Sequence, residues 1–284
     1  MVSMKRTSSS TYVFEAVDNR LQRTLIGHLR YALRYRPFFL YWVRRGLVTR
    51  YSQTSIGLLW AILQPLLSSL IYIIVFSYVV RVSTDPVPYP LFIVTSLVLW
   101  SYFNRIVFSG AASIIGNLDI VTRVQFPREF LPLGIMVESL VDLALGICII
   151  ALLFIIYHQP VTSYLLIAFY IFIPYTFLSL GLAFIFAGLA SVIRDLFQIL
   201  PLLLQLLMYL SPVIYPLSLV PKGIHLFYVI NPLGPIFAAY QETILFGKFT
   251  LLPEILLVTV FSVVILIAGY LFFKRMEWRF ADSL

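Results

Sequence analysis

Charged residues are scarce in this chain of 284 residues, of which aspartate, glutamate, lysine and arginine together make up only 11%. A soluble globular domain carries roughly 25% of these residues. Hydrophobic residues make up 61% of the sequence instead. This balance excludes an ordinary soluble domain and predicts a protein that lies largely in lipid.

Cysteine and histidine are almost missing as well. The one cysteine, Cys148, excludes an intrachain disulfide framework, and His28, His158 and His225 lie too far apart in sequence to indicate a metal site. No internal repeat is visible, which weakens the hypothesis of a carrier built from inverted repeats. The chain also lacks a phosphate-binding loop, because the Gly-Lys pair at 247–248 has neither the earlier glycine nor a following Ser or Thr. Any ATP that drives this protein would therefore be bound by another chain.

What the sequence does contain is six long apolar stretches separated by short polar segments. A hydrocarbon core about 30 Å thick needs roughly 20 apolar residues in a helix to cross it. We therefore predict an all-α integral membrane protein whose six transmembrane helices form a domain over residues 53–284. The spans fall near 57–80, 91–113, 131–156, 164–190, 197–214 and 253–273.

Basic residues are distributed unevenly between the two sides of such a domain. Segment 1–56 alone contains ten Lys or Arg against two acidic residues. Arg123, Arg128, Arg194, Lys274, Arg275 and Arg279 fall on the same side, and Arg81, Lys222 and Lys248 fall on the other. The positive-inside rule then predicts that both termini are cytoplasmic. The net charge of +8 is explained by topology and anionic lipid headgroups, so no nucleic-acid partner is expected.

The segment before the first span has the pattern of an amphipathic helix lying in the membrane interface. We expect this helix over 31–52, after a cytoplasmic extension at 1–30 for which the sequence indicates no role. At 100° per residue Phe39, Leu40, Val43 and Leu47 share one stripe, and Arg44 and Arg45 lie outside it. A basic anchor that only fixes topology is the alternative.

The polar loop 114–130 is too long and too mixed for a simple helical hairpin. Prolines interrupt it, and its apolar side chains would let an amphipathic piece dock into a groove on a partner. Arg123, Arg128 and Glu129 would form the polar rim of that contact. A helix lying on lipid headgroups is the alternative.

Three charged residues lie well inside predicted spans, away from the span ends, where each is costly unless it is paired or hydrated. Glu138 and Asp142 are four residues apart and share one helix face, and Arg105 on the preceding span is the expected counter-charge. Three alternatives stay open for this group. It is a buried structural pair, an access route for a diphosphate lipid headgroup with Arg105 receiving phosphate, or a proton relay in a carrier.

Several short motifs, in this order, carry a resemblance to a known family. They are Gly57-Leu-Leu-Trp-Ala-Ile-Leu-Gln-Pro, Phe126-Pro-Arg-Glu-Phe-Leu-Pro-Leu, Arg194-Asp-Leu, Ser211-Pro-Val-Ile-Tyr-Pro and Asn231-Pro-Leu-Gly-Pro. From about Arg36 onward the chain resembles the permease subunit of ABC type-2 exporters. The resemblance is to the polysaccharide branch, which exports O-antigen, capsule or teichoic acid chains.

This resemblance implies a bacterial inner-membrane complex of two permeases, as a homodimer, and two ATP-binding subunits. It implies that loop 114–130 and the short turn 191–196 are coupling elements that contact the ATPase. Their residues would be Arg123, Phe126, Pro127, Arg128, Glu129, Arg194 and Asp195. The partner would bind ATP and Mg, and this chain would hold no cofactor, no metal and no catalytic residue. For the turn 191–196 a simple charge pair at a helix end is the alternative.

The segment 215–252 contains two apolar pieces, each too short to cross a membrane, as re-entrant helices are. The resemblance implies that this region closes the pore on the outside, with Pro212, Tyr215, Asn231 and Pro232 as gate residues. A lid that only packs is the alternative.

The substrate implied is a lipid-linked polysaccharide, with polyprenyl diphosphate as its lipid. A sugar chain needs aromatic faces and hydroxyl groups along its path, and among the many aromatic residues Tyr72, Phe103 and Tyr175 are our candidates for lining the channel. A small-molecule (drug) exporter of the same fold stays open, as does a proton-coupled carrier using Glu138 and Asp142. An enzyme acting on polyprenyl-linked sugars would need a cluster of carboxylates or histidines at one membrane face, which the loops do not offer.

Overall fold

The computed structural model describes residues 34–277 except 53–58, 191, 194, 221–227 and 229. The extension 1–30, most of the gate piece 224–230 and the candidate Arg194 therefore lie outside the described residues. Within them every regular element is helical, as the sequence predicts. The elements are α2 (Arg36–Ser52), α3 (Leu59–Tyr72), the π-helix η2 (Ile73–Val79), α4 (Tyr89–Ala112), η3 (Ile115–Asn117), α5 (Leu118–Arg123), α6 (Phe130–Ile156), α7 (Leu165–Ala190), α8 (Leu196–Leu210), η4 (Leu217–Leu219), α10 (Leu233–Leu245) and α11 (Leu252–Met276).

Four of these helices, α4, α6, α7 and α11, are long and apolar enough to cross a membrane. The first and fifth predicted spans are also occupied by apolar helices, α3 with η2 and α8, but these are shorter by the same measure. Prolines lie inside both, Pro65 in α3 and Pro201 in α8. The protein is thus a multi-pass membrane protein with four candidate spans among the described residues.

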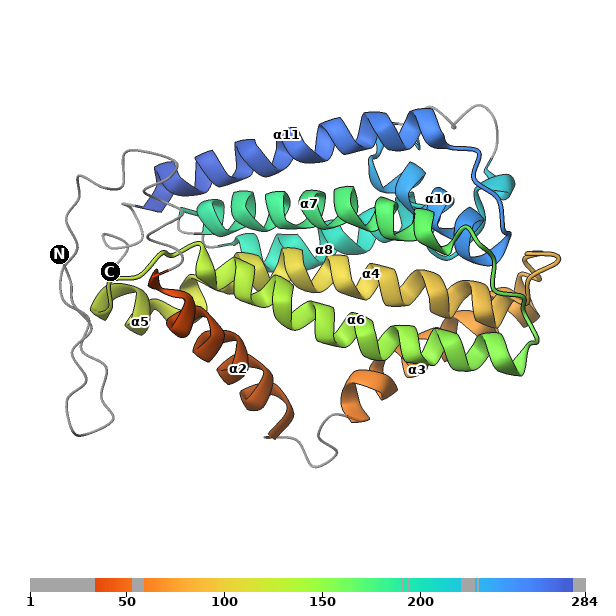
Figure 1. Ribbon diagram of the computed structural model, residues 1–284, viewed down its shortest axis with the longest axis horizontal. Coiled ribbons are helices and arrows are strands. Elements are labelled where there is room, and N and C mark those ends of the chain that lie inside the picture. Colours follow the sequence, from red (N-terminus) through yellow and green to blue (C-terminus); the bar gives the residue numbers. More distant parts are fainter. Residues whose placement is uncertain are drawn as a thin grey trace.

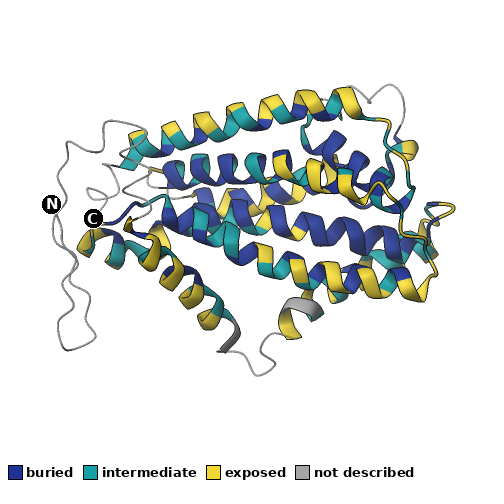
Figure 2. Cartoon of the chain, in the orientation of Figure 1, coloured by how far each residue is buried: buried dark blue, intermediate teal, exposed yellow. Residues whose placement is uncertain are grey.

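The long helices run side by side along the longest axis of the molecule, with α5 at one end and α10 at the other (Figure 1). We call these the α5 end and the α10 end. Helix α4 lies in the centre, with 78% of its span window buried, whereas the corresponding share is 22% for α11 (Figure 2). The exposed apolar side chains of α6 and α11 form the surface that lipid would cover.

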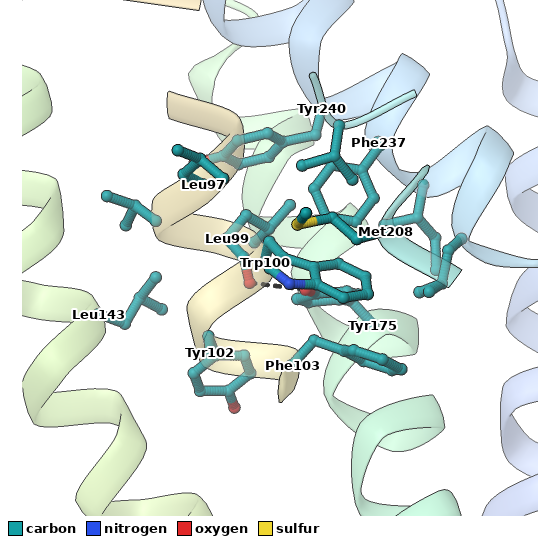
Figure 3. Packing of buried hydrophobic residues seen from close by; sticks show 14 of the residues in the cluster. Leu97, Leu99, Trp100, Tyr102, Phe103, Leu143, Tyr175, Met208, Phe237 and Tyr240 are labelled. Carbon is teal, nitrogen blue, oxygen red and sulfur yellow. Dashed lines mark hydrogen bonds between the residues drawn. The ribbon is translucent and has the colours of Figure 1, made fainter. Parts of the chain in front are cut away.

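Aromatic side chains fill the centre of the bundle between α4, α7 and α10 (Figure 3). Phe103 and Tyr175 are fully buried with ring centroids 5.9 Å apart, and the edge of Phe237 meets Tyr175 at 6.0 Å. The Tyr175 hydroxyl donates a hydrogen bond of 2.6 Å to the carbonyl of Leu99 (dashed in Figure 3). Such a partner is required where a phenol is buried away from water.

Helices α7 and α11 approach each other most closely at two glycines. A Cβ atom at Gly181 would lie 2.8 Å from the backbone of Ile265, and one at Gly269 would overlap the carbonyl oxygen of Gly181. In lipid, helix association depends on close van der Waals packing, which small residues permit. This contact joins α11 firmly to α7.

Helix α2 packs against the first half of α6 and crosses it obliquely (Figure 1). Its buried residues are Tyr35, just before the helix, Trp42 and Val43. The Trp42 ring fits over Gly134 of α6, where a Cβ atom would lie 2.8 Å from Cδ1. The apolar stripe predicted from periodicity therefore coincides only partly with the face that packs on α6. Val43 of that stripe is buried, but Leu40 is 55% exposed.

Candidate functional site

A polar cavity of about 360 Å³ lies between the end of α2 and helices α3, α4 and α6. Its polar lining consists of Arg50, Gln64, Ser68, Ser101, Asn104, Arg105, Ser109, Ser139 and Asp142. Trp100, Tyr102 and several aliphatic side chains complete the wall. A concave site with convergent polar groups inside an apolar bundle is a reasonable default candidate for a functional site.

Two arginines and two carboxylates meet beside this cavity, which all of them except Glu138 line, and we call them the span cluster. The Nη2 atom of Arg105 donates to Glu138 Oε2 at 3.0 Å, and its Nη1 atom forms an ion pair with Asp142. Arg50, near the end of α2, donates from Nη1 to Asp142 Oδ2 at 2.8 Å. The structure thus brings together the three charges that the sequence placed on neighbouring spans, and adds Arg50 to them.

The span cluster lies well inside the predicted hydrocarbon layer. At about 1.5 Å of rise per residue, Glu138 is roughly 12 Å and Asp142 roughly 18 Å from the start of α6. The Glu138 side chain is 5% exposed and that of Arg105 14% exposed. Two positive and two negative charges cancel, which is the condition under which ionised groups are tolerated at this depth.

Gly46 of α2 determines how closely α2 approaches the span cluster. A Cβ atom at this position would overlap the carboxyl group of Glu138. The absence of a side chain therefore lets the α2 backbone lie directly on the buried carboxylate. The cluster and this contact together hold α2 against α6.

The three candidate channel aromatics do not line the cavity. Phe103 and Tyr175 belong to the buried core, and the Tyr72 hydroxyl points toward the Met208 sulfur at 4.0 Å. Tyr102, which the sequence analysis did not select, does line it, and its hydroxyl lies 3.2 Å from Thr176 Oγ1. The channel role of Tyr72, Phe103 and Tyr175 stays a prediction.

The loop between α4 and α6 is folded onto the α5 end of the bundle. Phe126 is 6% exposed and packs on Phe38 of α2 with ring centroids 4.7 Å apart, and Pro127 is buried beside it. Arg123, at the end of α5, is exposed. Of these three predicted contact residues, Arg123 is therefore accessible to a partner. Phe126 and Pro127 instead pack the loop onto the bundle.

The remaining two predicted contact residues, Arg128 and Glu129, take part in a second charged group at the α5 end, which we call the loop cluster. Lys274 of α11 donates to Glu129 Oε2 at 2.7 Å and to Glu277 Oε2 at 3.1 Å. Arg128 donates from Nη1 to the backbone carbonyl of Glu277, and its Nε lies 3.9 Å from Glu277 Oε1. The loop cluster connects the residues just before α6 to the last turn of α11.

The second predicted coupling element is the turn between α7 and α8. Asp195 is exposed and directly precedes α8, and its backbone carbonyl accepts a hydrogen bond from the N–H of Gln198 at 3.0 Å. Its neighbour Arg194 lies outside the described residues. The coupling role of this turn stays a prediction.

At the α10 end, several uncharged side chains make connections. Asn231 donates from Nδ2 to Ser211 Oγ at 2.9 Å, and Tyr215 donates to the carbonyl of Tyr209 at 2.7 Å and also contacts the Tyr228 hydroxyl. Pro212 is buried, and Pro232 directly precedes α10.

Gln241 of α10 adds two hydrogen bonds at the same end. Its Nε2 atom donates to the carbonyl of Pro212 at 2.7 Å and to Ser96 Oγ at 2.9 Å, and the residue is 3% exposed. Gln241 is not among the residues predicted from the sequence, although a single amide within the apolar run 236–246 is a visible signal. The candidate gate residues are thus joined to α4 through this amide.

The geometry can be compared with known proteins. Residues 38–245 match the ABC-2 type transporter family. An O-antigen export system permease protein (RfbA) of Myxococcus xanthus is 30% identical over 263 residues, which are 92% of this chain and 100% of that relative. A protein of the same name from Klebsiella pneumoniae is 31% identical over 84% of this chain and 92% of its own length. The polysialic acid transport protein KpsM of Escherichia coli is 23% identical over 82% of this chain and 91% of its own length.

The family match covers well over half of the chain. The multi-pass helical architecture of the chain agrees with a membrane subunit. On these grounds the chain belongs to the ABC-2 type transporter family.

Proposed function

We propose that this protein is the membrane permease of an ATP-driven exporter that moves an O-antigen-like polysaccharide from the cytoplasmic to the outer side of the membrane. The observation that carries this proposal is the 30% identity to an O-antigen export permease along that relative's entire length. Because the similarity covers the whole length of that relative, it favours the same function for the two proteins.

The proposed topology has six spans with both termini in the cytoplasm of a bacterium, in its inner membrane. The four long helices would be four of these spans, and the other two would be α3 together with η2, and α8. The distribution of basic residues supports the orientation, because Arg123, Arg128, Lys274 and Arg275 all belong to the α5 end. The α10 end would then face outward, with α10 as a re-entrant helix.

We propose that an ATP-binding subunit docks at the α5 end and supplies ATP and Mg, with two copies of each subunit in the complex. Exposed side chains on α5, namely Asp119, Thr122 and Arg123, support a contact there. The buried Phe126 and Pro127 would transmit the movement of α5 into the bundle, and the turn 191–196 would give a second contact. The permease would contribute as a homodimer.

The substrate is proposed to be a glycan linked to a polyprenyl diphosphate. The hydroxyl and amide groups of the cavity are the kind of side chains that sugar hydroxyls can bond. Among the alternatives for the span cluster, its neutral pairing favours the structural one. A phosphate would compete with two carboxylate partners at Arg105 and with one at Arg50.

The decisive experiment is to delete the gene in its host and to follow the polymer on both sides of the membrane. We expect surface polysaccharide to disappear and a polyprenyl-linked glycan to accumulate inside, with full recovery on complementation. Mass spectrometry of the gently solubilised protein should show an ATP-binding subunit in equal ratio. Transport that needs a proton gradient and no ATPase would overturn the proposal in favour of the carrier.

A capsule exporter is a second candidate, favoured by the similarity to the polysialic acid transport protein. The same deletion distinguishes the two, because an O-antigen exporter would affect the lipopolysaccharide ladder and a capsule exporter the capsular layer. A teichoic acid exporter would affect a wall polymer instead. A drug exporter would leave every surface polymer unchanged.

A further inference from the structure

We propose that Arg128 and Glu129 are positioning residues that fasten the loop before α6 to the end of α11, so that the loop and α11 move as one body. This inference rests on the proposed function, in which the loop receives the ATPase. It assigns to these two residues partners inside the chain instead of partners on another subunit.

The first support is the geometry of the loop cluster. Lys274 bridges Glu129 of the loop and Glu277, which directly follows α11, at 2.7 and 3.1 Å, and Arg128 reaches the backbone and carboxylate of the same Glu277. The four side chains are between 14% and 28% exposed, so they are only partly accessible to another protein. Their two positive and two negative charges already cancel.

The second support is the apolar layer beneath these charges. Phe126 and Phe130 of the loop region pack in one cluster with Phe273 of α11, which is fully buried. Phe273 in turn contacts Phe184 of α7, with ring centroids 5.3 Å apart. Since packed cores are not continuously deformable, a displacement of the loop would carry the end of α11 with it.

The third support is the rigid contact farther along α11. At Gly181 and Gly269 the backbones of α7 and α11 lie in direct contact, which packs the two helices closely together. Loop, α11 and α7 thus form a mechanical path from the α5 end toward the α10 end. This path is distinct from the direct continuation of the loop into α6.

The test uses the intact permease coexpressed with its ATPase, and it reverses the charges of the pair. Glu129→Lys and Lys274→Glu should each lower export at least about fivefold, while the ratio of ATPase to permease stays unchanged. The double variant restores opposite charges and should recover at least half of the export. Arg275→Glu is the matched control, because it makes the same charge change at the adjacent, exposed residue and should export normally.

A different pattern would overturn the inference. If Glu129→Lys released the ATPase, Lys274→Glu did not, and the double variant failed to recover, Glu129 would face the ATPase directly. Rescue of export shows that the two residues act as a pair, and unchanged yields of monodisperse permease in the single variants separate positioning from a loss of folding.

Crosslinking gives a measurement that does not depend on the exported substrate. Cysteines at 129 and 274, introduced in a Cys148→Ser background, should be joined in high yield by a short bismaleimide, and the joined protein should still export. A low yield, or a joined protein that is blocked while both single-cysteine variants export, would refute common movement of the loop and α11. If the wild type exported no glycan, the proposed function would fail, whereas the crosslinking yield would still report on the position of the loop.

Discussion

The span cluster and the loop cluster have nearly the same composition in very different surroundings. Each contains two cations and two carboxylates, and in each a single cation bridges two acids, Arg105 in the span cluster and Lys274 in the loop cluster. The span cluster lies between α2, α4 and α6 at the depth of the hydrocarbon layer. The loop cluster lies where helix ends meet, beside residues that water can reach.

The difference in depth changes what each cluster can do. Ions within a bilayer must stay paired, because the alternative is an isolated charge in lipid. Ions nearer the membrane surface are less costly to separate, because water can partly solvate them. We therefore infer that the span cluster mainly maintains the fold, whereas the loop cluster mainly positions a moving segment.

Removing the shared cation of the span cluster should have the largest effect. Arg105→Leu leaves Glu138 unpaired and Asp142 with one partner fewer, and breaking a buried ion pair in this way costs about 3–5 kcal/mol. We expect a large loss of folded protein, measured as the yield of monodisperse permease after detergent extraction and as its melting temperature.

A compensating variant makes this prediction sharper. Glu138→Gln and Asp142→Asn, combined with Arg105→Leu, remove the unpaired negative charges, and Arg50, which is 36% exposed, can reach solvent. Yield should recover substantially. A triple variant as unstable as Arg105→Leu alone would show that packing at Arg105, and not its charge, is what matters.

The next largest effect should come from Gly46, the residue that lets α2 lie on Glu138. Gly46→Val inserts three carbon atoms where even a Cβ atom overlaps the carboxyl group, so overpacking of about 1–3 kcal/mol is expected. The melting temperature of the detergent-solubilised permease measures it. Gly116→Ala is the control, because a Cβ atom there meets nothing within 4 Å, and an equal loss in both variants would contradict the close approach.

A smaller effect is expected at the outer member of the span cluster. Arg50→Gln removes a half-exposed partner, while Arg105 continues to neutralise Asp142. We expect about 1 kcal/mol or less, together with easier proteolysis near α2. A loss as large as that of Arg105→Leu would mean that the two arginines are equally important for the fold.

Much of the fold was predictable because its main determinant is local. Continuous apolar length predicted helices at all six positions, and the four-residue spacing of Glu138 and Asp142 placed both on one face of α6. What periodicity could not decide is which apolar surface meets protein and which meets lipid. Leu40 is exposed and Trp42 buried on the same short helix, since both environments favour apolar side chains.

The candidate site was less predictable because its contacts join distant parts of the chain. Arg50 and Asp142 are 92 residues apart, and Glu129 and Lys274 are 145 residues apart. The sequence therefore indicated Arg50 and Lys274 only as basic residues that determine topology. Phe103 and Tyr175 could equally line a channel or fill a core by residue type, and their complete burial emerges only from the packing of α4 on α7.

The smallest effect is expected at Lys274 of the loop cluster, and the two clusters should also differ in how salt changes the loss of stability. Lys274→Met should lower the free energy of unfolding by about 1 kcal/mol or less in low salt, because its partners are partly exposed. Raising the salt concentration to 1 M shortens the screening length to about 3 Å, so the difference from the wild type should shrink further. The loss caused by Arg105→Leu should change less, because the Arg105 and Glu138 side chains are only 14% and 5% exposed. If both losses were screened alike, the span cluster would be open to water, and its assignment as a buried structural tie would be wrong.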